Sequence, residues 1–270
     1  SCIIIGMILD IFLYGLLILI GIIFFVWVLI NIYFHSSNIK IFPLKKLKRK
    51  KIIIILAHPD DEATSCSGTL TRLSKTSEVK MIILTKGERG QEGMKIDPQL
   101  KNIRTQELQN SLNIMNIKNL QHLDIGDNQL KDKYGDVKEI VEEEIKKFSP
   151  NVVITHDPSG LYGHPDHITV SEIVTNLQKI YQYSLWYTTL SKKILKNINM
   201  SNEASIETKK NSTALPNIRI FVLFQIFKKI RIVYGYKSQR NSFIKTLPFK
   251  FIPLWFYIAL TPFEYFKERE

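Results

Sequence analysis

The stretch KIIIILAHPDDEATSCSGTL, residues 51–70, joins an apolar run to a cluster of polar residues. Apart from the opening lysine, its first seven residues are all apolar, which is typical of a strand buried on both faces of a parallel sheet. His58, Asp60, Asp61 and Glu62 follow at once, and burying four such groups costs free energy unless they have partners. We therefore expect a buried strand that ends in a functional site, completed by another part of the chain.

Strands and helices are predicted to alternate through the following residues. Further strands are predicted at 79–85, 120–125, 151–157 and 184–190, and helices at 61–75, 98–116, 135–148 and from about 165 to about 180. This alternation predicts an α/β domain over residues 51–191, with a doubly wound, mostly parallel sheet flanked by helices.

The N-terminal part of the chain has the composition of a membrane span. Between Asp10 and Lys40 there is no Asp, Glu, Lys or Arg, and Ile11 to Ile30 alone is long enough to cross a bilayer core. A cleaved signal peptide fits less well, because no basic segment precedes the run and no Ala-x-Ala-like site follows it. We predict an uncleaved transmembrane anchor over residues 1–36, with Met7 as an alternative start.

A basic linker, predicted over 37–50, follows this span. The sequence KKLKRKK, residues 45–51, has six basic residues in seven. Basic residues beside a span stay on the cytoplasmic side, so we expect a single-pass membrane protein whose catalytic domain faces the cytoplasm. The same cluster is attracted to an anionic membrane surface. Nucleic acid is not expected as a partner, because no recognisable nucleic-acid module accompanies the charge.

The C-terminal part changes composition twice. Residues 192–217 are dominated by Asn, Ser and Lys, which predicts a loop or a lid. Residues 218–270 hold ten Lys or Arg against three Glu, interleaved with aromatic residues. Within them, residues 249–263 are predicted either to lie in the membrane interface or to pack on the sheet as a C-terminal helix. The two cysteines, Cys2 and Cys66, do not predict a disulfide framework.

Four of the six histidines follow the predicted strands that end near residues 57 and 157. They are His58, His156, His164 and His167. In open α/β sheets, ligands bind at the carboxyl ends of the strands, so these segments can meet in space. His58, His167 and Asp61 are a sufficient ligand set for a catalytic zinc that keeps a position for water, and the same set suits iron(II).

Three further residues of these segments have roles in such a site. Asp60 could take a proton from the bound water, and His164 could stabilise negative charge as it develops. Asp166 could orient an imidazole. Each motif alone could be only a helix start with an Asp cap, and His156 is as easily structural as functional. The two motifs together favour a site.

Four segments resemble one known family in sequence, order and spacing. They are AHPDDE (57–62), TKGERG (85–90), IRTQEL (103–108) and YGHPDH (162–167), and they resemble the PIG-L/LmbE family of zinc-dependent de-N-acetylases. The resemblance implies a Rossmann-like α/β domain that removes acetyl from N-acetylglucosamine linked to a lipid or a small molecule.

The resemblance also implies a role for individual residues. His58, Asp61 and His167 would hold the metal, Asp60 would be the general base, and His164 would stabilise the tetrahedral intermediate. Two further residues match the family's pattern, and each of them has a second interpretation. Arg104 would contact the polar aglycone or be a charge on a helix surface, and Asp127 would lie near the sugar or form a turn.

The expected function is therefore a metal-dependent hydrolase that deacetylates the N-acetylglucosamine of a glycolipid or other glycoconjugate. The predicted anchor favours an amphipathic substrate, as in the family members that act on N-acetylglucosaminyl-phosphatidylinositol. A phosphoesterase would want ligands for a second metal, which the motifs do not offer. A nucleotide-binding protein would want G-x-G-x-x-G after the first strand. A non-catalytic glycolipid-binding membrane protein remains the alternative, although all the residues needed for catalysis are present.

Overall fold

The computed structural model describes residues 2–35, 39–90, 98–195, 213–245, 247 and 252–269. It divides into two units, Ser1–Asn38 and Ile39–Glu270. The first unit is the single helix α1 (Cys2–His35), and its part from Ile4 to His35 is long and apolar enough to cross a membrane. A membrane anchor and a signal sequence would both have this composition.

The second unit, which we call the body, is built on one eight-stranded sheet. Its strands are β1 (Lys40–Ile41), β2 (Lys51–Leu56), β3 (Glu78–Ile83), β4 (Asn119–His122), β5 (Val152–His156), β6 (Ser184–Thr189), β7 (Ile218–Phe221) and β8 (Phe263–Arg269). They lie in the order β1-β7-β8-β6-β5-β2-β3-β4. The run from β6 to β4 is parallel throughout, and β8 is antiparallel to both of its neighbours.

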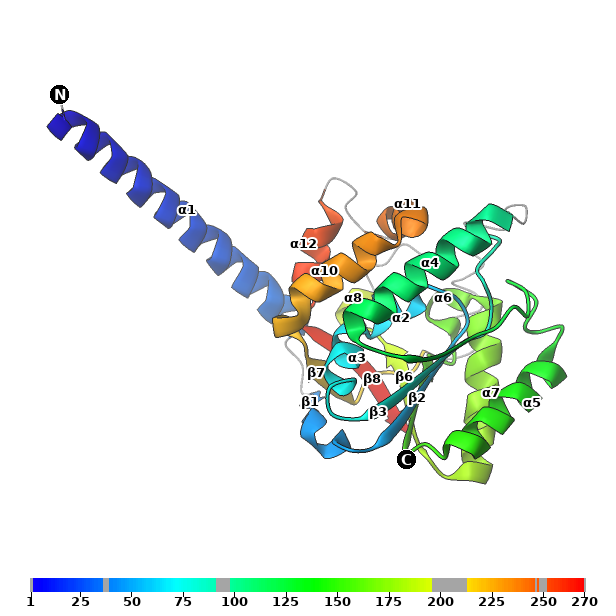
Figure 1. Cartoon of the computed structure of the whole chain (residues 1–270). Coiled ribbons are helices and arrows are strands. Elements are labelled where there is room, and N and C mark those ends of the chain that lie inside the picture. The colour runs from blue at the N-terminus through cyan, green and yellow to red at the C-terminus, as the bar shows by residue number, and fades with distance from the viewer. Residues whose placement is uncertain are drawn as a thin grey trace. The chain divides into compact units, whose positions relative to one another are not determined.

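Helices cover both faces of this sheet (Figure 1). They are α2 (Asp61–Ser65), α3 (Ser67–Leu73), α4 (Pro98–Met115), α5 (Tyr134–Phe148), α6 (Gly160–Gly163), α7 (Pro165–Tyr181), α8 (Lys192–Leu195), α10 (Ile226–Gly235), α11 (Arg240–Lys245) and α12 (Leu254–Ala259). Three 3-10 turns, η1 (Leu44–Leu47), η2 (Leu223–Gln225) and η3 (Lys237–Gln239), complete the described elements.

The apolar run of β2 lies at the centre of two cores. Ile52 and Ile54 face one core with side chains of α3, α4 and α10, while Ile53 and Ile55 face the other with side chains of α5 and α7. All four isoleucines are fully buried, and each contributes about 1.5–3 kcal/mol to folding. Burial on both faces explains why this strand has no polar alternation.

The expected α/β fold with helices flanking a largely parallel sheet is confirmed, with one difference in the sheet. It is mixed, because β8 runs against β6 and β7. β1 lies within the predicted linker, and β7 and β8 lie within the basic-aromatic segment, so both segments contribute strands to the body. The helix expected over 61–75 is broken at Cys66, whose φ of −151° is not helical.

Some expectations fall on residues that the structure does not describe. These are 196–212 of the predicted loop or lid, and 249–251 at the start of the predicted interfacial segment. The described remainder of that segment forms α12 and the first residue of β8.

The strand order reverses between β2 and β5, since β3 and β4 lie on one side of this pair and β6 on the other. Crevices outside the carboxyl ends of strands at such a reversal are where ligands bind in open α/β sheets. β2 leads directly into His58, and β5 ends at His156. The fold therefore brings the two histidine-bearing segments to the same edge.

Candidate active site

The turn after β2 presents two adjacent carboxylates to different partners. Asp60 has φ 98°, in the left-handed region that few residues other than glycine adopt. The backbone N–H of His58 donates to Asp61 Oδ2 at 2.7 Å, which closes the turn. Asp61 faces His156 and His167, whereas Asp60 Oδ2 lies 3.1 Å from a guanidinium nitrogen of Arg104.

The second histidine segment is held by the start of α7. His164 is the N-cap of this helix, and its Nδ1 accepts a hydrogen bond from the backbone N–H of Asp166 at 3.2 Å. His167 lies in the first turn, with its Nδ1 3.3 Å from the carbonyl oxygen of Gly160. Gly160 has φ +69°, so a glycine suits this position.

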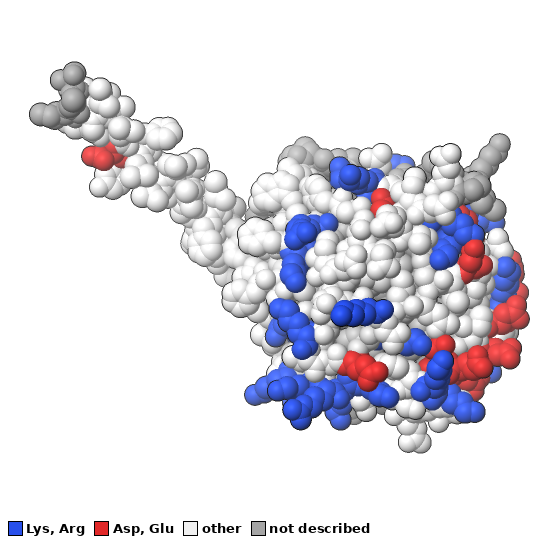
Figure 2. Space-filling model, in the orientation of Figure 1, with Lys and Arg blue, Asp and Glu red and all other residues white. Residues whose placement is uncertain are grey.

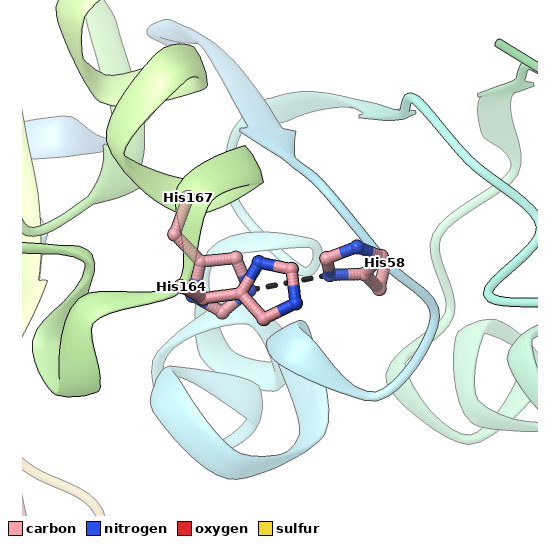
Figure 3. Close-up of side chains that lie close together, drawn as sticks. All are labelled: His58, His164 and His167. Carbon is pink, nitrogen blue, oxygen red and sulfur yellow. Dashed lines mark hydrogen bonds between the residues drawn. The ribbon is translucent and has the colours of Figure 1, made fainter. Parts of the chain in front are cut away.

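His58, Asp61 and His167 lie against one another in pairs. His58 Nδ1 lies 3.2 Å from His167 Nε2 and 3.6 Å from Asp61 Oδ2, and His167 Nε2 lies 3.2 Å from Asp61 Oδ1. Ligand atoms around a tetrahedral zinc are separated by about 3.3 Å, given bond lengths near 2.0–2.1 Å. Figure 3 shows the contact between His58 and His167, with His164 beside them.

The hydrogen bonds of the two imidazoles leave lone pairs facing each other. His58 Nε2 lies 3.1 Å from carboxylate oxygens of both Asp127 and Asp166, which only accept when ionised, so this nitrogen carries a hydrogen. His167 Nδ1 donates to the Gly160 carbonyl, which places the lone pair of His167 on Nε2. In the neutral rings, the nitrogens that face each other are both acceptors. A cation between them removes this repulsion, so the donor set fits a metal ion.

The pKa shifts of His58 and Asp61 also favour a cation between them. Burial alone would lower the pKa of His58, but hydrogen bonds to Asp127, Asp166 and Asp61 raise it well above its usual value. Burial would raise the pKa of Asp61, yet His167 and His156 hold it well below the usual range. The surrounding carboxylates thus favour positive charge at this point.

Asp127 and Asp166 tie His58 to neighbouring loops. Asp166 accepts hydrogen bonds from the backbone N–H groups of Asn128 and Leu130, at 2.6 and 3.1 Å. Asp127 Oδ2 accepts from the backbone N–H of Arg89 at 3.1 Å, and its own N–H donates to Glu88. These bonds orient the imidazole, in the way carboxylates orient metal-binding histidines.

Asp60 is held by Arg104, which is buried rather than exposed on a helix surface. The guanidinium of Arg104 also donates to the carbonyl oxygens of Gly87, at 3.0 Å, and Pro59. A Cβ at Gly87 would overlap this guanidinium, and φ +67° also favours glycine there. Burial raises the pKa of Asp60 to about 7, against the opposing charge of Arg104 and with a contribution from Asp61. A carboxylate that titrates near neutrality suits proton transfer.

His164 and His156 are both kept neutral. Burial and the neighbouring His58 and His167 lower the pKa of His164 to about 2, and its Nδ1 is an acceptor, so Nε2 carries the hydrogen. Burial, with His167, lowers the pKa of His156 to about 4. His156 Nε2 accepts from the backbone N–H of Ala57 at 3.0 Å, which ties β5 to the end of β2. The structure therefore gives His156 a structural contact.

Glu62, for which the sequence predicted no role of its own, holds the backbone of Asp60. Its Oε2 accepts from the backbone N–H of Asp60 at 3.1 Å, and its Oε1 accepts from the hydroxyls of Ser111 and Tyr236, each at 2.6 Å. Glu62 and Tyr236 are fully buried. Glu107 of the IRTQEL segment likewise accepts from Ser238, through both the backbone N–H and the hydroxyl.

Comparisons with known proteins agree with this site. Residues 53–178 match the family model described as PIG-L: GlcNAc-PI de-N-acetylase. This stretch resembles a PIG-L domain. The resemblance to the PIG-L/LmbE family, seen in the four sequence motifs, is thereby confirmed, and the matched residues include both histidine segments.

Curated relatives of this domain are deacetylases. The chain is 28% identical over 163 residues to 1D-myo-inositol 2-acetamido-2-deoxy-alpha-D-glucopyranoside deacetylase of Segniliparus rotundus, covering 48% of this chain and 50% of that protein. It is 36% identical over 121 residues to diacetylchitobiose deacetylase of Thermococcus kodakarensis, covering 44% and 45%. The alignments span about half the length of these relatives.

Solved structures share the fold. The N,N'-diacetylchitobiose deacetylase of Pyrococcus horikoshii aligns with a TM-score of 0.60 and 20% identity, covering 84% of this chain and 85% of that one. A 4-carboxy-2-hydroxymuconate hydratase from Pseudomonas putida aligns with a TM-score of 0.57 and 14% identity, covering 82% and 96%. Proteins of different reaction classes thus share this fold, so the function has to be argued from the site.

Proposed function

We propose that this PIG-L domain protein is a metal-dependent hydrolase that removes acetyl from the N-acetylglucosamine of a glycoconjugate. The observation that carries the proposal is that His58 Nδ1 and His167 Nε2 face each other at 3.2 Å, with Asp61 in contact with His167 and Asp60 next to it in the chain. The names of the curated relatives, which are deacetylases of N-acetylglucosamine-containing compounds, support the same reaction. We class the parallel strands β4-β3-β2-β5-β6 as Rossmann-like, because their order reverses at the site.

His58 Nδ1, the Asp61 carboxylate and His167 Nε2 would hold the metal, which we take to be zinc, with iron(II) as the alternative. When bound, the ion would polarise the acetamide carbonyl and lower the pKa of a water molecule. Asp127 and Asp166 would keep the proton of His58 on Nε2, away from the ion.

Asp60 and His164 have different roles in amide hydrolysis. Asp60 takes the proton of the attacking water and returns a proton to the leaving nitrogen, so that acetate and a free amine are released. Arg104 holds Asp60 in place through its contact at 3.1 Å. His164 donates from Nε2 to the carbonyl oxygen as that oxygen becomes negative. The contacts of Arg104 and Asp127 with the aglycone and the sugar stay predictions.

We infer further that the substrate is amphipathic. Helix α1 would anchor the chain in a membrane, and the basic residues 45–51 would keep the body on the cytoplasmic side, near anionic lipid. An enzyme tethered in this way meets lipid-linked sugars at high local concentration. N-acetylglucosaminyl-phosphatidylinositol is the substrate that we favour testing first.

The test is acetate release by detergent-solubilised, zinc-loaded protein, with Asp60→Asn as the matched blank. N-acetylglucosaminyl-phosphatidylinositol and water-soluble diacetylchitobiose are offered side by side. We expect turnover of the lipid-linked sugar to exceed that of the soluble one at equal concentration. Turnover of the soluble compound alone would contradict the amphipathic substrate and leave the reaction standing. No acetate from either compound, with specific binding of the glycolipid, would instead favour the non-catalytic glycolipid-binding alternative.

A further inference from the structure

Two phenylalanines of the body are far more exposed than its other large apolar side chains. Phe224 in η2 is 85% exposed and Phe227 at the start of α10 is 80% exposed, higher than any other large hydrophobic residue in the part of the body that the structure describes. Trp255 of α12 is 49% exposed. Such exposure of large aromatic side chains marks an interaction surface when they lie together.

Phe224 and Phe227 lie on one outward side of η2 and α10, and Trp255 lies on the neighbouring helix α12. Phe224 and Phe227 are three residues apart, and exposed Arg231 follows one turn later on the same side of α10. The backbone N–H of Trp255 donates to the Tyr234 hydroxyl at 3.2 Å, which joins α12 to the far end of α10. We call Phe224, Phe227, Arg231 and Trp255 the aromatic ridge. The opposite side of α10 is buried in the core. Phe224 and Phe227 stay largely exposed, although the Phe224 ring contacts that of Phe221.

The charge around the ridge has one sign. Residues 218–263 contain eight Lys or Arg and no Asp or Glu, and of the eight Lys229 is buried against Glu264 and does not contribute to the surface. In Figure 2 the part of the body that carries α10 and α12 in Figure 1 shows mainly white and blue atoms, while most red atoms gather at the right of the view. Exposed aromatic side chains bordered by basic ones are typical of surfaces that lie in the interface of an anionic bilayer.

We propose that the aromatic ridge docks the body onto a bilayer that contains anionic lipid. A bilayer is favoured over a protein partner because the same chain carries a candidate span and the basic run 45–51, which keep lipid within reach of the body. Phe and Trp enter the headgroup region, while Arg231 and nearby lysines contact lipid phosphates. This docking does not depend on the proposed reaction.

Docking would have a consequence for the site. The inner side of the same segment carries Tyr236, which holds Glu62 and through it the backbone of Asp60. The ridge and the support of Asp60 thus belong to one segment. A bilayer against the ridge would set the orientation of this segment, and with it of the site, relative to a lipid-linked sugar. This step alone rests on the proposed function.

The test measures where single labels lie relative to lipid, in the full chain. In a Cys2→Ser background, Phe224→Cys or Phe227→Cys is labelled with an environment-sensitive fluorophore. Cys66 stays unlabelled, because its thiol is buried and burial raises its pKa. The matched control is Ile180→Cys, a 60% exposed position on α7, which packs on the other face of the sheet. Protein is reconstituted in vesicles of phosphatidylcholine with or without phosphatidylserine.

We expect lipids with brominated acyl chains to quench labels at 224 and 227 several-fold more than the label at 180, and aqueous iodide to show the reverse order. Removing phosphatidylserine, or adding Arg231→Glu, should weaken the lipid quenching. Equal iodide access at 224, 227 and 180 in vesicles would overturn the proposal. The proposal would also be overturned if the label at 227 were protected from iodide without lipid, and more so at higher protein concentration. A second copy of the chain would then cover the ridge.

Discussion

Two neighbouring carboxylates show how single residues acquire different chemistry at this site. Asp61 lies against imidazoles, and its pKa is held well below the usual range by His167 and His156 although burial opposes this. Asp60 has the same side chain one position earlier, yet burial raises its pKa to about 7. The left-handed backbone of Asp60 separates the two environments, so that one carboxylate suits a cation and the other suits a proton.

The sequence allowed the prediction of some of these residues but not of others. His58, Asp61, His164 and His167 could be predicted, because each follows a strand whose carboxyl end faces ligands in this class of fold. Glu62 could not, since a glutamate in the first turn of a helix is common for reasons of charge alone. Its partners lie 49 and 174 residues further along the chain, and no local pattern connects them.

We predict that Tyr236→Phe lowers kcat by on the order of tenfold to a hundredfold and leaves KM nearly unchanged, because Glu62 loses one of the hydroxyls that hold it under Asp60. The matched control is Tyr183→Phe, which removes the bond from a buried hydroxyl to the Val174 carbonyl. Both changes should cost about 1–3 kcal/mol of stability, measured by urea unfolding. An equal loss of kcat in both variants would contradict a specific role for Tyr236.

At the scale of elements, the strands that define the site could be predicted and those at the sheet edge could not. β2 and β5 are apolar runs, because helices cover them on both faces. β8 has the sequence FEYFKER and β1 only two residues, so neither has the pattern of a buried strand. Pairing of β8 with β6, nearly 80 residues earlier in the chain, makes it a strand. Tertiary contacts decide such cases.

A buried ion pair joins β8 to the helices near the site. Lys229 Nζ of α10 lies 2.8 Å from Glu264 Oε1, and the same carboxylate accepts from the backbone N–H groups of Gly68 and Thr69. Both charged residues are about 95% buried. Removing one partner leaves the other charge buried without compensation, which costs more than the pair contributes.

We predict that Glu264→Gln and Lys229→Met each destabilise the protein by about 3 kcal/mol. The double variant should cost about 1–3 kcal/mol less than the sum of the two, because no unpaired charge remains. Urea unfolding of the unchanged protein, the two single variants and the double variant, all in the same detergent, gives the double-mutant cycle. Additive costs would show that the two charges do not stabilise one another.

At the scale of the whole molecule, the chain consists of the helix α1 and the body, and both hydrophobic clusters belong to the body. Every residue of the two hydrophobic clusters lies at or after Leu44, so no described core residue belongs to α1. The apolar N-terminal helix and the strand–helix alternation could both be predicted from composition and period.

We predict that a chain starting at Ile39 unfolds cooperatively, with a free energy of unfolding within about 1 kcal/mol of the full chain, because both hydrophobic clusters of the body lie at or after Leu44. It should also keep acetate release from a water-soluble substrate. Circular dichroism during urea titration and an acetate assay check both points. A body that fails to fold without residues 1–38 would show that α1 contributes to its core.

The central claim is that Asp61 holds a metal and Asp60 moves the proton, and one matched pair of variants tests it. Asp60→Asn and Asp61→Asn make the same chemical change at adjacent positions. Zinc affinity is measured by titration of chelator-stripped protein, beside acetate release. We expect Asp60→Asn to bind one zinc with unchanged affinity and to lose about 10²–10⁴ of its rate, and Asp61→Asn to lose at least about a hundredfold in zinc affinity. Wild-type turnover in Asp60→Asn, or equal zinc affinity in the two variants, would contradict the account.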